Sequence, residues 1–257
     1  MKRFGLKVFI GVIILFVVFN GYITGWVKDN NNIESLYLMI FGFIPLSNRN
    51  FLFEICLSVI NILYVIYIFS QDLQFEIKIM GTYIFTRTNK RKKWISKQYF
   101  YKFLGICAYF VIQYIFVFII GLIYGYEISN LITFFETVIM SFSITTLAVF
   151  SMVVLINTLS IFCDYIFSYI FVVMSIVLNI ISVSVLMNTN YNWIVKYFPF
   201  SQHLIGIKDI EIIDRSINMF SKYIYDYGVN ISLLIIFIVI SFGISVSLYK
   251  ITKMDIF

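Results

Sequence analysis

The amino-acid sequence predicts an all-α integral membrane protein with six transmembrane helices. Hydrophobic residues make up 61% of the chain and charged residues only 12%, whereas a soluble domain carries roughly a quarter charged residues. A soluble fold of 257 residues has too little interior to hide so much apolar surface. Apolar stretches long enough to cross a bilayer recur along the chain. These observations argue against a soluble enzyme, a nucleic-acid-binding protein and a disordered chain.

Six stretches reach the roughly 20 mostly apolar residues that a spanning helix needs. They cover residues 8–27, 51–70, 103–124, 131–156, 165–187 and 229–249. The first follows three basic residues, as the apolar part of a signal peptide would, but it is too long and no small-residue cleavage site follows. We therefore expect it to be retained, and residues 1–257 to form a single transmembrane domain.

The basic residues predict the orientation of the chain. With an even number of spans, both termini and the 71–102 loop lie on one side, and that side carries 13 of the 19 Lys and Arg residues. The other side carries 6, spread over longer loops. Because cytoplasmic loops are enriched in Lys and Arg, we expect both termini and this loop to be cytoplasmic.

The cytoplasmic 71–102 loop mixes basic residues with apolar ones such as Phe75, Ile84 and Trp94. A loop that only fixes topology, and touches anionic lipid, would explain its charge. It would not explain a length of about 30 residues or the apolar side chains, which favour short amphipathic helices that dock on a partner.

The outer loop, residues 188–228, carries apolar residues at helical spacing in its later part. Ile213, Ile217, Phe220 and Ile224 alternate with polar residues, which predicts an amphipathic helix on the outer face. Pro199 is expected to interrupt any helix before it. The loop is either a structural cap over the bundle or a surface that contacts substrate.

This layout resembles the type-2 permease family of ABC exporters. The resemblance covers the whole chain in layout, and a degenerate motif of about 22 residues in the cytoplasmic loop, where the family has a coupling helix that fits a groove of its ATPase subunit. Thr88 and Asn89 stand where the family often has a proline. The residues that the resemblance assigns to ATPase coupling are Glu76, Gly81, Thr82, Arg87, Arg91, Trp94 and Lys97.

The resemblance implies a separate ATPase subunit, because no G-x-x-x-x-G-K-[ST] phosphate-binding loop occurs in the chain. ATP and Mg²⁺ would be bound by a separate P-loop ATPase, and this chain would be neither an enzyme nor a cofactor-binding protein. A second permease half, identical or different, would complete the unit in a bacterial cytoplasmic membrane. The apolar and aromatic spans suit a hydrophobic or amphipathic substrate, such as an antimicrobial peptide or a lipid-like molecule.

Two acidic residues, Glu54 and Glu136, fall near the outer ends of predicted spans. Ionisable residues in spans are costly and often functional, so these two either reach the headgroups or line an outer vestibule that attracts a cationic part of a substrate. Asn61, Gln113, Asn157 and Asn179 are expected to form helix–helix hydrogen bonds.

Two other functional classes share parts of this pattern. An ion-coupled transporter or channel predicts ionisable residues near the midplane and interrupted helices, and neither is evident. A non-transporting immunity or sensor protein that binds a peptide or a partner shares every feature except force transmission. A single histidine, His203, argues against metal-dependent membrane proteases.

Overall fold

The computed structural model describes residues 2–26, 32–42, 59–71, 73, 76–77, 91–213 and 222–253. Within this part the chain is helical, with two isolated bridge pairs and no strand. The all-α prediction is therefore confirmed. The helices are α1 (Lys2–Trp26), α2 (Ile33–Gly42), a helix over Val59–Gln71, α4 (Arg91–Ile123), α5 (Leu131–Leu159), α6 (Tyr165–Leu186) and α7 (Val229–Lys253), with two short 3₁₀ helices, η1 (Asn192–Tyr197) and η2 (Pro199–Ser201).

Four helices, α4 to α7, are long and apolar enough to cross a membrane. They coincide with the last four predicted stretches to within a residue, apart from the earlier start of α4 and the later ends of α5 and α7. Residues 8–26 of the first predicted stretch lie within α1, which has 25 residues, and residue 27 lies outside the described residues. Of the second, residues 59–70 are helical, whereas 51–58 lie outside the described residues.

Local sequence explains where the helices begin and turn. The side chain of Asn130 accepts a hydrogen bond from the Ile132 N–H at 2.9 Å and caps the start of α5. Gly125, in the turn between α4 and α5, has a φ of 81°, which a residue without Cβ adopts at little cost. Only five residues, 160–164, separate α5 from α6, so these two helices are antiparallel neighbours.

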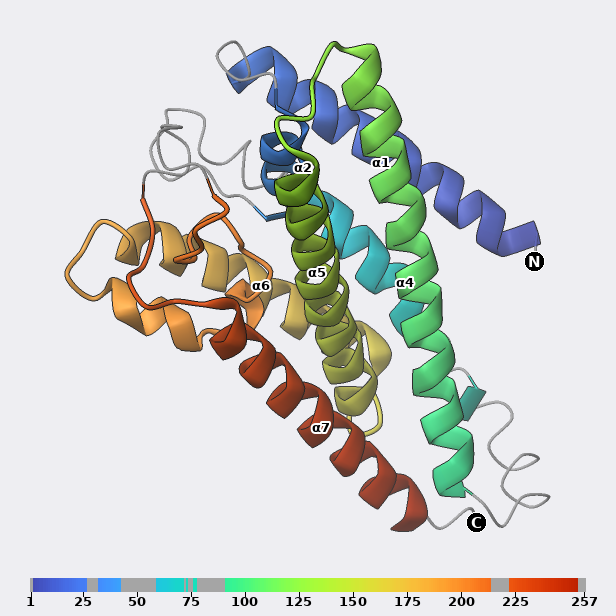
Figure 1. Cartoon of the computed structure of the whole chain (residues 1–257). Helices are drawn as coiled ribbons and strands as arrows, with labels where there is room; N and C mark the ends of the chain where they lie inside the picture. The colour runs from blue at the N-terminus through green and yellow to red at the C-terminus, as the bar shows by residue number, and fades with distance from the viewer. Residues whose placement is uncertain are drawn as a thin grey trace.

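Helix α5 is the centre of the bundle, because it packs against α2, α4, α6 and α7 (Figure 1). The hydroxyl of Ser247 in α7 lies 2.8 Å from that of Tyr99 in α4 and 3.0 Å from that of Thr158 in α5. Helix α4 therefore begins at the end of the bundle where α5 and α7 end. The Val59–Gln71 helix also ends there, since Ser70 lies 2.9 Å from Tyr165 at the start of α6.

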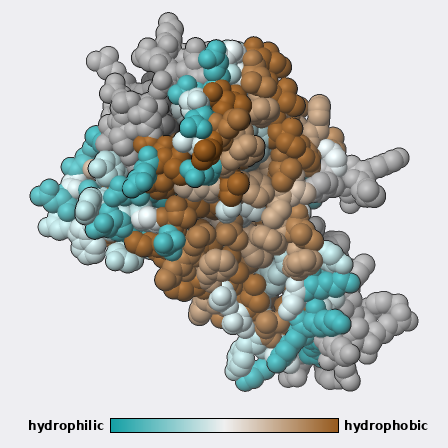
Figure 2. Space-filling view, in the orientation of Figure 1, coloured by the Kyte–Doolittle hydropathy of each residue, from teal (hydrophilic) through white to brown (hydrophobic). Residues whose placement is uncertain are grey.

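On the face of the molecule that Figure 2 shows, apolar side chains fill a broad area between two hydrophilic regions. Ile119, Phe171 and Phe242 each expose about half or more of their surface. A soluble protein rarely exposes so large a contiguous apolar surface, whereas lipid chains cover such a band without cost. The surface therefore has the character that a helical membrane protein requires.

Helix α2 was not predicted, and its burial is the main surprise of the fold. All ten of its residues are buried, although the 28–50 region was expected to be a loop. Its first N–H, on Ile33, donates to the Glu127 carbonyl at 3.0 Å, and the Gly42 carbonyl accepts from Gly206 N–H at 2.9 Å. A ten-residue helix spans about 15 Å, too short to cross a bilayer, so it packs inside the bundle instead.

The outer loop is folded differently from the prediction. Its described parts are the two 3₁₀ helices, turns, and a bridge between Lys208 and Ile224. Pro199 starts η2, where its missing N–H costs nothing. The predicted amphipathic helix is absent from residues 211–213 and 222–228, which are turns or extended, and 214–221 lie outside the described residues. Ile213 and Ile224 are buried, as expected, but in a compact cap.

Candidate functional site

We refer to the end of the bundle where α4 begins and α7 ends as the basic end. The cationic residues in the described first two turns of α4 and last turn of α7 are Arg91, Lys92, Lys93, Lys97, Lys250 and Lys253. Two described acidic residues, Glu76 and Asp164, accompany them. This excess of positive charge is typical of the cytoplasmic side of a membrane protein.

Residues 91–102 form the first three turns of α4 rather than a separate helix, so α4 runs unbroken for 33 residues. Of the predicted coupling residues, Arg91 and Trp94 are half-buried, and Trp94 packs against the hydrophobic core. Lys97 is exposed, with its ammonium 5.4 Å from the centre of the Tyr101 ring. Gly81, Thr82 and Arg87 lie outside the described residues.

Two hydrogen bonds tie α4 to the segment that precedes it. Gln98 Nε2 donates to Glu76 Oε2 at 2.6 Å. The buried Lys102 ammonium donates to the Phe69 carbonyl at 2.6 Å, near the last turn of the Val59–Gln71 helix, where a cation favourably opposes the helix dipole. The beginning and the end of the predicted coupling loop are therefore both attached to the membrane helices.

A hydroxyl cluster joins three helices just inside the basic end. Besides the contacts of Tyr99, Thr158 and Ser247 described above, the Thr158 hydroxyl bonds to the Gly243 carbonyl at 3.0 Å. A Cβ on Gly243 would lie 2.6 Å from Val154 Cγ1, so the missing side chain allows α7 to approach α5 closely. These contacts lock α7 to both α4 and α5.

A side-chain amide bridge connects the Val59–Gln71 helix to α4. Asn61 Nδ2 donates to Gln113 Oε1 at 3.0 Å, and Gln113 Nε2 donates to Asn61 Oδ1 at 2.9 Å and to Tyr109 Oη at 2.8 Å. The prediction of interhelical hydrogen bonds is confirmed for these two amides. It is wrong for Asn157, whose amide donates to the Val153 carbonyl of its own helix.

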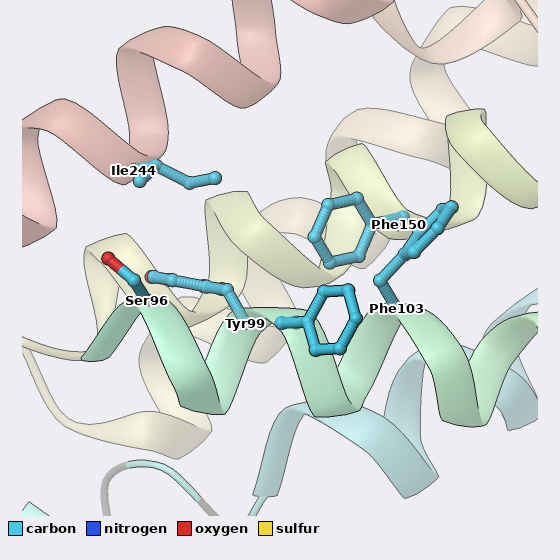
Figure 3. Close-up of a pocket in the computed structure, with 6 residues that line it drawn as sticks. Ser96, Tyr99, Phe103, Phe150 and Ile244 are labelled. Carbon is cyan, nitrogen blue, oxygen red and sulfur yellow. The ribbon is translucent and has the colours of Figure 1, made fainter. Parts of the chain in front are cut away.

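A side groove of about 310 Å³ opens between α4, α5 and α7 near the basic end (Figure 3). Its lining residues are Ser96, Tyr99, Phe100, Phe103, Phe150 and Ile244. Sequence reasoning did not find it, because its three walls come from parts of the chain that are 50 to 150 residues apart. None of the predicted site residues lines it.

Of the two predicted substrate-path residues, only Glu136 lies in the described structure. Glu136 is exposed in the second turn of α5, next to the exposed Phe135. Glu54 lies outside the described residues. Exposure near the start of α5, at the opposite end of this helix from the basic end, fits a carboxylate that reaches the headgroup region.

Glu34, at the start of α2, is a buried acidic residue that the sequence analysis missed. One carboxylate oxygen accepts hydrogen bonds from the Ser129 hydroxyl at 2.8 Å and from the Ser129 N–H at 3.1 Å. The other oxygen is buried without a hydrogen-bond partner in the described structure. An acidic residue directly before an apolar run is a helix-start signal, and this signal was available in the sequence.

The cap on the opposite side contains a second polar cluster, built around the fully buried Lys208. Its ammonium donates to the Gln202 carbonyl at 2.7 Å and lies 5.6 Å from the centre of the Tyr227 ring. Burial lowers the pKa of Lys208 to about 7. Burial, aided by the nearby Lys208 charge, lowers the pKa of His203 to about 4. The Tyr227 hydroxyl donates to Gln202 Oε1 at 2.8 Å, which joins the two halves of the cap.

Comparison of the chain with protein families, with characterised proteins and with solved structures gave no match. The functional argument therefore rests on the sequence pattern and on the geometry described above.

Proposed function

We propose that the chain is the permease half of an ABC exporter. In this proposal it crosses the bacterial cytoplasmic membrane six times with both termini inside, and a separate P-loop ATPase binds ATP and Mg²⁺. A second permease half, the same or different, completes the transporter. It moves a hydrophobic or amphipathic substrate, such as an antimicrobial peptide or a lipid-like molecule.

The observation that carries this proposal is the continuity of α4 from the basic end into the membrane. Arg91, Trp94 and Lys97 occupy the first turns of the same helix that contains Gln113 and ends at Ile123. A push on these first turns moves the membrane part of α4 as a rigid body. A topology anchor that only touches lipid has no need of such a connection.

The attachments of this segment extend the argument to a second helix. The Lys102 ammonium donates to the Phe69 carbonyl near the basic end. The Asn61–Gln113 bridge joins the same two helices deeper in the bundle. Motion imposed on α4 is therefore shared by the Val59–Gln71 helix. Two linked helices that move together supply the mechanical element that ATP-driven transport requires.

The directions of the described helices support the six-crossing topology. Helices α4 and α6 run away from the basic end, whereas the Val59–Gln71 helix, α5 and α7 run toward it. Helix α1 runs parallel to α4, because a Cβ on Gly11 would touch Tyr109 and the Phe19 and Tyr124 rings lie 5.3 Å apart. Successive spans then alternate in direction.

The test is a pull-down of tagged full-length chain from its native host in mild detergent, followed by mass spectrometry. We expect a P-loop ATPase to accompany the wild type and to be lost from Arg87→Glu/Arg91→Glu/Lys97→Glu. The matched control is Lys250→Glu/Lys253→Glu, which reverses charge at the same end on α7 and should retain the ATPase.

Two results would overturn the proposal. One is the absence of any P-loop ATPase from the wild-type sample. The other is equal loss of the ATPase from both charge-reversal variants, which would indicate a general charge effect. Recovery of a peptide without an ATPase would favour the alternative, a non-transporting immunity or sensor protein.

A further inference from the structure

The side groove near the basic end has the shape and lining of a site for a hydrocarbon chain. Ser96, Tyr99, Phe100 and Phe103 follow the i, i+3, i+4, i+7 spacing of one helical face. Ile244 of α7 forms the opposite wall (Figure 3).

The floor of the groove is aromatic, and its lining offers little polarity. The Phe103 and Phe150 rings pack edge to face with centroids 5.2 Å apart. The Tyr99 hydroxyl is already bonded to Ser247. An apolar occupant therefore loses no hydrogen bond on entering.

The groove extends along α4 over a length that fits within one leaflet of the bilayer. Tryptophan prefers the membrane–water interface, and Trp94 lies only two residues before Ser96 on α4. From Ser96 to Phe103 the helix rises about 10 Å, within the roughly 15 Å of hydrocarbon in a single leaflet. The groove consequently opens onto the acyl chains of the leaflet next to the basic end.

Positive charge lies one helical turn from the Ser96 end of the groove. Lys92 and Lys93 precede Ser96 by four and three residues, so they lie one turn below it on the same face of α4, and both are exposed. Of the described acidic residues at this end, Glu76 is hydrogen-bonded to Gln98 and Asp164 lies in the turn between α5 and α6. Neither is on the face of α4 that carries Lys92 and Lys93.

We propose that this groove binds an anionic phospholipid, with an acyl chain between α4 and α7 and its phosphate at Lys92, Lys93 and the Ser96 hydroxyl. A second copy of the chain is a poorer occupant, because a copy in the same orientation would place its own basic end against these lysines and repel them. The site does not depend on the exporter proposal, since it requires no ATPase.

The test measures lipid preference at the groove by fluorescence quenching. A single-tryptophan chain is made by Phe100→Trp in a background where the three tryptophans are replaced by Phe. It is reconstituted in vesicles of mixed phosphatidylglycerol and phosphatidylcholine, one of which carries brominated acyl chains that quench indole on contact. Phe171→Trp in the same background reports the exposed face of α6 as a reference.

At the groove, we expect phosphatidylglycerol to bind at least fivefold more tightly than phosphatidylcholine, since each lysine near an anionic surface contributes about 1 kcal/mol, or about fivefold. Lys92→Gln/Lys93→Gln should bring this ratio to within about twofold. Lys250→Gln is the matched control, because its ammonium lies over the Phe162 ring, and it should leave the ratio unchanged.

Three results would each overturn the proposal. The first is an equal preference at the groove and at the α6 reference position. The second is a groove preference that survives Lys92→Gln/Lys93→Gln in a variant whose helical circular dichroism is unchanged. The third is an equal loss of preference in Lys250→Gln, which would indicate only the general charge of this end.

Discussion

The amide bridge between Asn61 and Gln113 is expected to contribute strongly to the packing of two helices. Both amides are buried, and each accepts a hydrogen bond from the other at 2.9 to 3.0 Å. Replacing Gln113 by Leu leaves both ends of the Asn61 amide without this partner. A buried polar group left unsatisfied costs about 1–3 kcal/mol, although interhelical hydrogen bonds in membranes average only about 0.6 kcal/mol. We expect Gln113→Leu to destabilise the chain by about 2 kcal/mol.

The double variant Asn61→Leu/Gln113→Leu separates the bridge from the packing around it. It removes both amides, and only the Tyr109 hydroxyl loses its partners from the bridge. The cost of the double variant should therefore be smaller than the sum of the two single variants by about 1–3 kcal/mol.

The assay is reversible unfolding of the purified full-length chain in mixed detergent micelles, followed by helical circular dichroism. The free energies of the wild type, both single variants and the double variant complete the cycle. If the two single effects add to within about 0.5 kcal/mol, the amides do not act as a pair, and the argument for linked motion of these helices loses its central contact.

Two further predictions concern the basic end and the cap. Gly243→Ala should destabilise the bundle by about 1–3 kcal/mol, as overpacking does. The reason is that the added Cβ would lie 2.6 Å from the stiff Val154 side chain. An unfolding midpoint equal to that of the wild type would contradict the close packing of α7 on α5. Burial lowers the pKa of Lys208 from 10.5 to about 7. Between these pH values the folded chain therefore binds fewer protons than the unfolded chain. The free energy of unfolding should rise with pH in this window by up to about 1.4 kcal/mol per pH unit. Lys208→Met should remove this rise. Its melting temperature should therefore exceed that of the wild type at pH 6, and the difference should shrink toward pH 10. A difference that stays constant with pH would mean that Lys208 does not titrate in this window.

The candidate residues of the basic end were singled out from the sequence, whereas two buried charged residues were not. Arg91, Trp94 and Lys97 were singled out from a motif, and the structure adds that they begin a continuous helix. Glu34 and Lys208 were missed, because nothing local marks a charged residue as buried. Their burial follows from neighbours that are distant in sequence, such as Ser129 for Glu34 and Tyr227 for Lys208.

The sequence by itself determined the membrane class, the positions of the long helices and the excess of positive charge at one end. Each of these properties is a sum over neighbouring residues, such as the hydropathy of about 20 positions, so it needs no knowledge of the fold. Only the tertiary structure decided that α2 is buried, that Asn61 meets Gln113, and that a groove opens between α4 and α7. These features depend on contacts between segments far apart in the chain, and no local pattern encodes which distant helix supplies the partner.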